Sequence, residues 1–202
     1  GTPPGRWMGG GVAALGHGEI HEGAQVSEAQ LQLLLGMGLD PVTGDLLGKA
    51  YPVFPSVEDR IAARLAQLDS ALGAAERAEA VAVIEAEESA HRSRRAVAGF
   101  DFTFSLPKSA SVLWGVADAA TQARITEAHH AAVAEVVAFM EREVAATRSG
   151  ATSRDGAVAQ VEVTGLIATA FDHFDSRAGD PQLHTHVVVS NKVRTVFDGK
   201  WR

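Results

Sequence analysis

Three of the eight histidines in this chain lie close together in sequence, at spacings that suit one metal ion. His184 and His186 are two residues apart, and in a β-strand such side chains point to the same face. His173 lies 11 residues before His184, across a segment rich in Ser, Gly, Asp and Pro that predicts a turn. Neutral imidazoles are common ligands of divalent metals, and three of them leave positions open for a substrate; a set of histidines alone suits Mn²⁺, Zn²⁺ or Ni²⁺. The pattern predicts a metal site; the alternative is surface or core histidines that lie near one another by chance.

Two strands must pair to bring these histidines together. Residues 161–171 predict one strand, and the β-branched run after His186 predicts another over residues 184–193. Pairing them antiparallel would place His173 beside the other two. A third strand is predicted over residues 100–105, where phenylalanines alternate with the polar side chains of Asp101, Thr103 and Ser105.

Helices are predicted on either side of this third strand. A short helix is expected over residues 27–35, ended by Gly36, and a helical region over residues 56–95, where Ser56 and Asp59 resemble a capping pair. A long helix with an apolar stripe is expected from residue 118 to about 147. The pattern is α+β, an antiparallel sheet backed by helices.

Composition narrows the chemistry. The 202 residues are 46% hydrophobic, enough for one sizeable core, and contain no cysteine, so a metal site must use histidine and carboxylate. We find no apolar run long enough to cross a membrane. The net charge of −7 argues against a nucleic-acid partner, yet it is uneven: residues 1–90 carry −8 and residues 91–202 carry +1.

Two blocks of the sequence resemble a known family. Residues 171–186 read FDHFDSRAGDPQLHTH, which is similar to the three-histidine motif of conjugative relaxases of the TrwC/TraI type, within the His-hydrophobic-His endonucleases. Residues 99–114 resemble the family's second block, with an acid followed by a Thr-Phe-Ser-x-Pro-Lys-Ser run. The ends at residues 4–7 and 198–202 also resemble the family, so the likeness covers nearly the whole chain.

The resemblance implies a relaxase, with the palm-like fold shared by rolling-circle initiators. It implies metal-assisted nicking of single-stranded DNA at a plasmid transfer origin, through tyrosyl transesterification that leaves a 5′-phosphotyrosine. It further implies Mg²⁺ or Mn²⁺ at His173, His184 and His186, a bacterial cytoplasmic location, a possible C-terminal helicase and accessory proteins of the relaxosome.

One family feature is missing from the sequence. The family's nucleophilic tyrosine precedes the Gly-Arg-Trp segment, whereas the only tyrosine here is Tyr51, which the following Pro52 biases toward extended chain and which we expect to be a half-buried aromatic. We therefore expect a single relaxase domain over residues 1–202, truncated at both ends, with a helical region at 56–95 and a catalytic sheet core at 99–202. The fragment alone is expected to be inactive, with Tyr51 as nucleophile the lesser alternative.

Asp101 is the next candidate. In the family the matching acid supports the histidine cluster and the tyrosine. A carboxylate that accepts a ligand's remaining ring N–H fixes its orientation, and a carboxylate can also take the proton of an attacking phenol. The remaining interpretation is an ordinary aspartate on a solvated strand face.

For several other polar and aromatic residues, the sequence gives weaker support for a role in binding DNA. Lys108 and Ser109 lie at a predicted helix start that could hold a DNA phosphate, although simple capping by Ser109 explains them too. Arg177 could contact DNA or pair with a nearby aspartate. The three tryptophans could stack on bases, with Trp114 favoured as core.

Two alternatives to a relaxase stay open: a rolling-circle replication initiator, and a non-catalytic metal- or single-strand-DNA-binding module.

Overall fold

Two compact units make up the structure, a computed structural model that describes residues 3–91, 95–149 and 159–202. One unit combines residues Gly1–Ala50 with Ala98–Arg202 and is called the sheet unit. The other, Tyr51–Val97, is called the helical unit.

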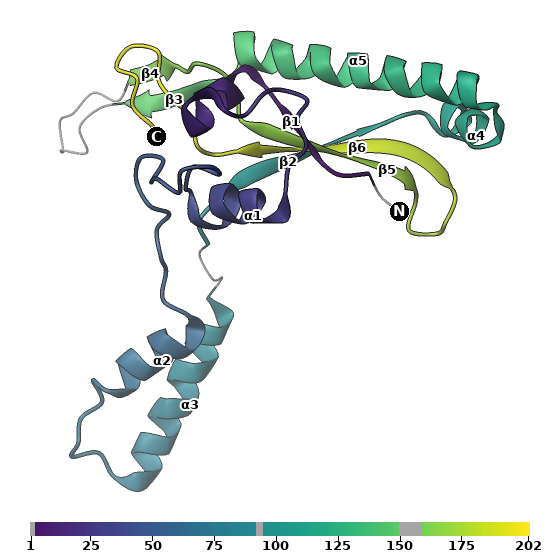
Figure 1. Cartoon of the computed structure of the whole chain (residues 1–202). Coiled ribbons are helices and arrows are strands. Elements are labelled where there is room, and N and C mark those ends of the chain that lie inside the picture. The colour runs from purple at the N-terminus through teal and green to yellow at the C-terminus, as the bar shows by residue number, and fades with distance from the viewer. Residues whose placement is uncertain (1–2, 92–94, 150–158) are drawn as a thin grey trace. The chain divides into compact units, whose positions relative to one another are not determined.

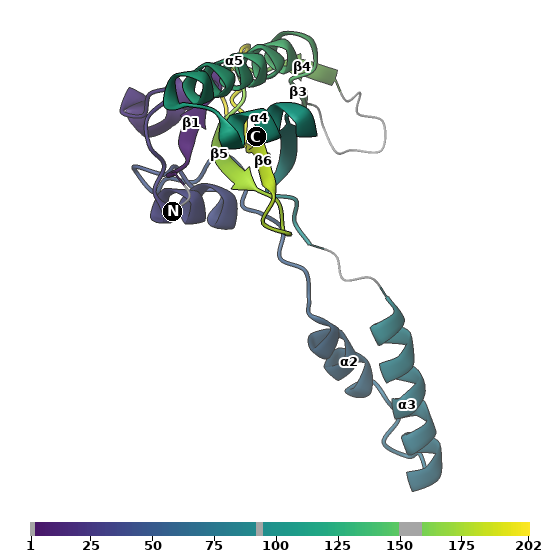
Figure 2. The same ribbon diagram turned by 90° about the vertical axis from the view of Figure 1, so that its right-hand side faces the viewer.

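The helical unit is a pair of helices, α2 (Val57–Leu65) and α3 (Ala74–Ala90), packed side by side (Figure 2). Ser56 begins α2 as expected: its hydroxyl accepts from the Asp59 N–H, and the Asp59 carboxylate accepts from the Ser56 N–H. The side chains of Arg60 and Arg64 pair with Glu88 of α3 at 2.8 and 3.0 Å. Helix α3 ends at Ala90, short of the expected residue 95, because His91 is extended.

The sheet unit is built on a four-stranded antiparallel sheet in the order β1-β5-β6-β2. Its strands are β1 (Arg6–Met8), β5 (Ala168–Asp175), β6 (Pro181–Ser190) and β2 (Gly99–Ser105). The predicted hairpin of the histidine block is β5–β6, in a register that sets His173 directly opposite His184. Strand β2 pairs with β6 so that Thr103 lies opposite His186.

The prediction of one strand over residues 161–171 is wrong. Residues Ala159–Glu162 form β4, which pairs with β3 (Ala146–Ser149) in a separate two-stranded ribbon, and β5 begins only at Ala168. The break lies at Gly165, whose φ is +144° and where an added Cβ would lie 2.5 Å from the Gly11 nitrogen. Only glycine tolerates this backbone and this contact. The long helix α5 (Ala119–Glu143) ends before the expected residue 147 because the chain enters β3.

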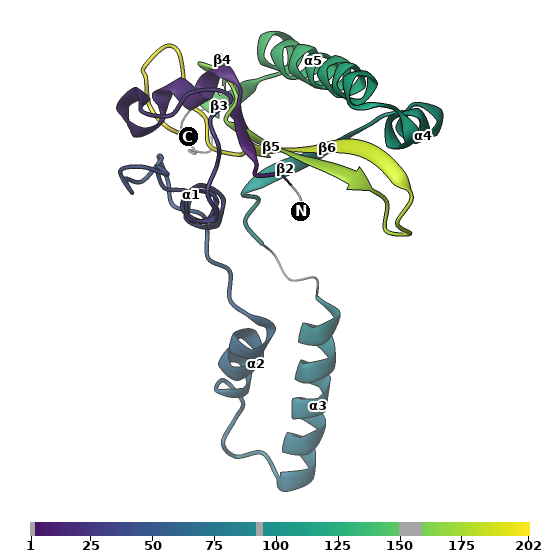
Figure 3. The same cartoon turned by 45° about the vertical axis from the view of Figure 1, so that its right-hand side comes forward.

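Helices cover both faces of the sheet (Figures 1 and 3). On one face, α5 packs against a core cluster that includes Val133, Val137, Ala170 and Val187. On the other face lies α1 (Glu28–Leu31). A second cluster involves η1 (Gly10–Gly18), which lies near β1, and η2 (Gln32–Met37); its buried members are Trp7, Val12, Leu15, Ile20, Val26, Leu34, Leu47 and Ile167. Helix α4 (Lys108–Val116) contacts β6 near the hairpin end.

The expected α+β architecture, an antiparallel sheet backed by helices, is confirmed. The short helix expected over residues 27–35 runs on past Gly36 and ends at Gly38, which adopts the left-handed conformation. Strand β1 lies outside the range 99–202 that we expected to hold the sheet core, and the extent of the domain stays a prediction.

Within the described residues, no helix is both long enough and apolar enough to span a bilayer.

Candidate metal centre

The three histidines of the motif meet on one face of the β5–β6 hairpin. Because His173 lies opposite His184 and His186 follows two residues later, all three rings project to the same side. Their ring centroids form a nearly equilateral triangle with sides of 5.2, 5.2 and 5.3 Å. All three side chains are half-buried, so solvent and a ligand can reach the cluster.

This triangle has the size that a shared ion requires. Three imidazoles bound to one ion through bonds of about 2.1 Å would have centroids about 5.3 Å apart at tetrahedral angles and about 4.6 Å apart at the octahedral angles that Mg²⁺ prefers. As the side chains stand, no three His, Cys, Asp or Glu residues in the described part of the chain are arranged to hold a metal ion. Rotation about the Cβ–Cγ bond, which is soft in histidine, redirects a ring nitrogen while leaving the centroid nearly in place. The histidines therefore fit one ion by the spacing of their rings, although not by the present direction of all their ring nitrogens.

Two of the rings are oriented by hydrogen bonds at Nδ1. His184 Nδ1 lies 2.9 Å from the Gln182 carbonyl oxygen, and His186 Nδ1 lies 2.9 and 3.0 Å from the two Asp101 carboxylate oxygens and 3.3 Å from the Thr103 hydroxyl. Since the Gln182 carbonyl and the nearer Asp101 carboxylate only accept, each Nδ1 carries a proton, and the Nε2 of His184 and His186 keeps a lone pair for a metal. Such outer hydrogen bonds are typical of histidines that bind metal.

A buried polar network lies behind the histidines, on the opposite face of the hairpin. The Asp172 carboxylate, 7% exposed, accepts hydrogen bonds from Thr185 Oγ1 at 2.6 Å, Arg6 at 2.6 Å and His130 Nε2 at 2.9 Å. Thr185 in turn lies 2.8 Å from His129 Nε2 on α5. Because the Thr185 hydroxyl donates to Asp172, it accepts from His129. Asp172 and Thr185 are directly opposed in the hairpin, so this network holds the same register that aligns the histidines.

The network shifts the pKa of two of its members. Burial alone would raise the pKa of Asp172, but the hydrogen bonds from Thr185 and Arg6 outweigh it and hold the pKa below its usual value. Burial lowers the pKa of His129, and the neighbouring His130 adds to this effect. The lowered pKa favours the neutral form of His129, whose Nε2–H donates to Thr185.

We expect acid to weaken the fold through His129. Its folded-state pKa lies below the unfolded value of about 6.5, so below that pH the unfolded chain binds a proton that the folded chain does not. The free energy of unfolding should thus fall as the pH drops from 7.5 to 5.5, as measured by urea denaturation. His129→Gln, which keeps a donor for Thr185, should reduce this fall, whereas His21→Gln in an exposed loop should not. Equal pH dependence in all three proteins would contradict the assignment.

The weaker candidates lie apart from this arrangement or have other partners. Ser109 does not cap α4, because the helix begins at Lys108 with Pro107 as its N-cap and without a side-chain cap. Lys108 donates to the Pro181 carbonyl oxygen and lies 3.4 Å from Asp180. In the described structure Arg177 pairs with neither Asp175 nor Asp180. Their roles in DNA binding stay predictions.

Of the four aromatic candidates, Trp7 is fully buried, and Trp114, Trp201 and Tyr51 are half-buried. Trp7 is 0% exposed, so it belongs to the core and cannot stack on a base as the fold stands. Trp114 stacks on Phe174 with centroids 5.1 Å apart and donates to Thr126. Trp201 is half-buried at the surface, and Tyr51 is half-buried in the helical unit.

Sequence reasoning missed the network around Asp172. A signal was present, because Asp172 and Thr185 alternate with the histidines and so must face the helix side of the sheet. What the sequence did not show was that Arg6, His129 and His130, from distant segments, would supply their partners.

Comparison with known proteins places the chain among relaxases. It matches the family model described as TrwC relaxase over residues 1–202. Among curated relatives, multifunctional conjugation protein TraI of Escherichia coli is 39% identical over 104 residues, which is 52% of this chain and 5% of that protein. TraI of strain K12 is 37% identical over 110 residues, 54% of this chain and 6% of that protein.

Solved structures of the relaxase TrwC have the same fold. A metal-bound complex of TrwC with oriT DNA is 26% identical to this chain with a TM-score of 0.61, covering 98% of this chain and 50% of that one. A metal-free complex is 25% identical with a TM-score of 0.59, covering 98% and 52%. The chain thus spans about half the length of these TrwC chains and a small part of TraI.

Proposed function

The chain belongs to the TrwC relaxase family, and from this premise we propose that it is the metal-binding part of a conjugative relaxase that nicks one DNA strand at a plasmid transfer origin. The observation that carries the proposal is the triangle of His173, His184 and His186, with sides of 5.2–5.3 Å, on an accessible sheet face. The partner would be single-stranded origin DNA in the bacterial cytoplasm. A helicase segment in the same protein and relaxosome accessory proteins would be further partners.

The three histidines would hold one divalent ion through ring nitrogens, with Mg²⁺ or Mn²⁺ as the working ion. When bound, the ion would polarise a non-bridging oxygen of the scissile phosphate and offset the negative charge that develops there. The role of the chain is to fix the rings: the Gln182 carbonyl and the Asp101 carboxylate hold the Nδ1–H groups of His184 and His186. Both Nε2 atoms then stay available without a change of tautomer.

The reaction would be a transesterification. A tyrosine phenol oxygen forms the new bond to phosphorus, the bond from phosphorus to the 3′ oxygen breaks, and that oxygen takes up a proton to balance the one that the phenol loses. Asp101, 52% exposed in its side chain, lies at the edge of the histidine cluster where it could accept the phenol proton. Its contact with His186 favours the orienting role.

In the family the nucleophilic tyrosine precedes the Gly-Arg-Trp segment, whereas Tyr51, the one tyrosine of the sequence, follows that segment. We therefore infer that the attacking phenol comes from a residue that is not among these 202. The 202 residues alone would bind metal and DNA without forming a covalent product.

Asp101→Asn should weaken divalent-ion binding by about 10- to 100-fold, the usual cost of losing an outer partner of a metal-bound histidine. The amide still lies beside His186 Nδ1 but no longer carries the negative charge that makes the ring a better ligand. Calorimetric titration with Mn²⁺ measures the change. Glu135→Gln, which removes an exposed carboxylate of α5, is the control and should bind as the parent chain does. Equal affinity in all three proteins would mean that Asp101 is only a strand aspartate.

Strand cleavage tests the function itself. Labelled single-stranded DNA from the transfer origin of the element that encodes this protein would be incubated with the protein extended to its native start codon and Mg²⁺ or Mn²⁺. We expect a covalent protein–DNA product on a denaturing gel, abolished by chelation. Metal and DNA binding without any product would instead favour a non-catalytic module.

A further inference from the structure

A basic pocket lies at the other end of the sheet unit from the histidines. It has a volume of about 440 Å³ and is formed by the end of β3, the loop after η2 and the last residues of the chain. The lining residues are Lys49, Arg148, Ser149, Lys200, Trp201 and Arg202. Residues 201 and 202 pair with Arg194 and Val193, which follow β6, whereas His184 and His186 lie within β6 and His173 lies opposite His184 on β5.

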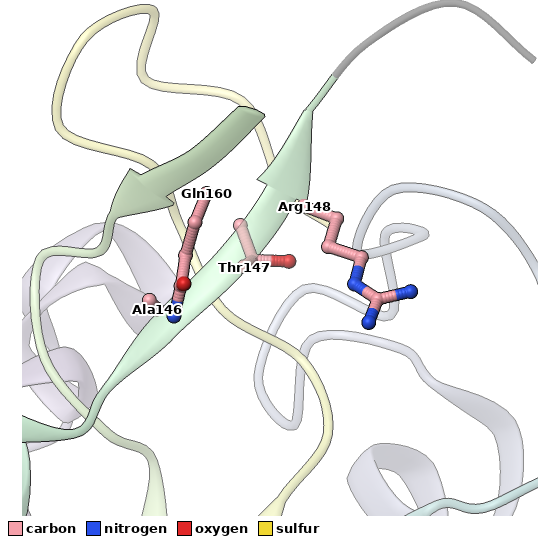
Figure 4. Close-up of a pocket in the computed structure, with 4 residues that line it drawn as sticks. All are labelled: Ala146, Thr147, Arg148 and Gln160. Carbon is pink, nitrogen blue, oxygen red and sulfur yellow. The ribbon is translucent and has the colours of Figure 1, made fainter. Parts of the chain in front are cut away.

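A second hollow of about 630 Å³ adjoins it on the β3–β4 ribbon and shares Arg148 with it. It is lined by Ala146, Thr147, Arg148 and Gln160, and the Arg148 side chain extends from the ribbon away from Gln160 (Figure 4). Among the described residues, no acidic side chain lines either hollow. Arg148 can therefore contact a ligand that extends from one hollow into the other.

The charge of the pocket is not neutralised from within. Arg202 pairs with Asp198 at 2.9 Å and also donates to Ser149. In the described structure, Lys49, Arg148 and Lys200 form no ion pair, and all three are exposed. Like charges gathered in one hollow repel one another, so a bound anion would relieve that repulsion. In a protein with a net charge of −7, such a site concentrates positive potential at one place.

The pocket wall is fixed by backbone contacts rather than by side chains alone. Gly48 has a φ of +75°, and an added Cβ there would lie 2.5 Å from the Trp201 carbonyl oxygen. The two segments are thus in close contact, and a ligand would meet a preformed surface, which reduces the entropy that binding costs. The half-buried Trp201 side chain packs against the core and also lines the pocket.

Proteins bind single-stranded nucleic acids with cationic side chains that contact backbone phosphates and with aromatic rings on which bases stack. The basic pocket has both kinds of side chain. We propose that this basic pocket is a second contact site for single-stranded DNA, binding backbone phosphates through Lys49, Arg148 and Lys200 with a base against Trp201. The proposal rests on the proposed function, since DNA is the substrate there. A strand bound at both places would have its scissile phosphate at the histidines and flanking nucleotides in the pocket.

The test is the binding of a fluorescent single-stranded oligo-dT to the chain, measured by anisotropy over a range of salt concentrations. We compare the parent chain with the double variant Arg148→Ala/Lys200→Ala. The matched control is Arg124→Ala/Arg142→Ala, which removes the same charge from exposed positions of α5. We expect the pocket variant to bind about tenfold more weakly or worse near 0.1 M salt. The slope of log K against log[salt] should fall by about 1.4, since each phosphate contact to a single strand contributes about 0.7.

Equal affinity and slope in the pocket variant and the control would overturn the proposal, as would a parent chain that binds no oligo-dT. Calorimetric titration of Mn²⁺ into the same proteins separates this result from a failure of the proposed function. Unchanged metal affinity with lost DNA binding assigns the defect to the pocket. An intact pocket effect in a protein that binds no metal would instead contradict the metal centre and leave the DNA site standing.

Discussion

His184→Ala should remove measurable divalent-ion binding and lower DNA cleavage by the intact relaxase by a factor on the order of 10³. His184 is one corner of the histidine triangle: its ring centroid lies 5.2 Å from that of His173 and 5.3 Å from that of His186. Without it, the two remaining histidines leave one side of the ion to water alone. Calorimetry with Mn²⁺ measures the first effect, and formation of the covalent DNA product measures the second.

The control for this variant is His21→Ala, an exposed histidine of the N-terminal segment that should change neither measurement. His184→Ala should also fold normally, because its ring is half-buried and its one hydrogen bond goes to the Gln182 carbonyl oxygen. Unchanged metal affinity in a folded His184→Ala protein would rule out the three-histidine site.

Asp172→Ala should destabilise the fold by about 3 kcal/mol, the lower end of the range for breaking a buried ion pair because Arg6 is 24% exposed. The substitution leaves Arg6, His130 and Thr185 without their acceptor in a buried region. Urea denaturation measures the loss. Metal affinity should fall as well, because the pairing of Asp172 with Thr185 holds the register of the histidine strands.

Asp175→Ala serves as the control, because this aspartate of the same strand is exposed; its effect should stay within about 0.5 kcal/mol. Asp172→Asn, which keeps an acceptor oxygen for Thr185, should lose less stability than Asp172→Ala. If both Asp172 variants proved as stable as the control, the network would be a by-product of packing rather than a support for the site.

The sequence was sufficient to predict the histidine cluster, because strand geometry alone determines which side chains share a face. Residues 184 and 186 had to project together once they formed a strand, and the turn between residues 173 and 184 required a hairpin. The same argument placed Asp101 on the polar face of β2, and the register of β2 with β6 then put it beside His186.

Long-range contacts explain what the sequence did not predict. The break at Gly165 depends on a close approach to Gly11, and the end of α5 depends on the pairing of β3 with β4. The Asp172 network draws on Arg6 and on α5, segments that are 166 and 42 residues away. The basic pocket combines Lys49, Arg148 and Lys200, so a count of charge along the chain showed no basic stripe.

Covalent capture of DNA tests the central claim most directly. Labelled single-stranded origin DNA with Mn²⁺ would be offered to the 202-residue chain and to the protein extended to its native start codon, and products would be resolved on a denaturing gel. We expect a covalent product from the extended protein only, lost on chelation and in His184→Ala. A product from the 202-residue chain would make Tyr51 the nucleophile, and the absence of product from both proteins would contradict the assignment as a relaxase.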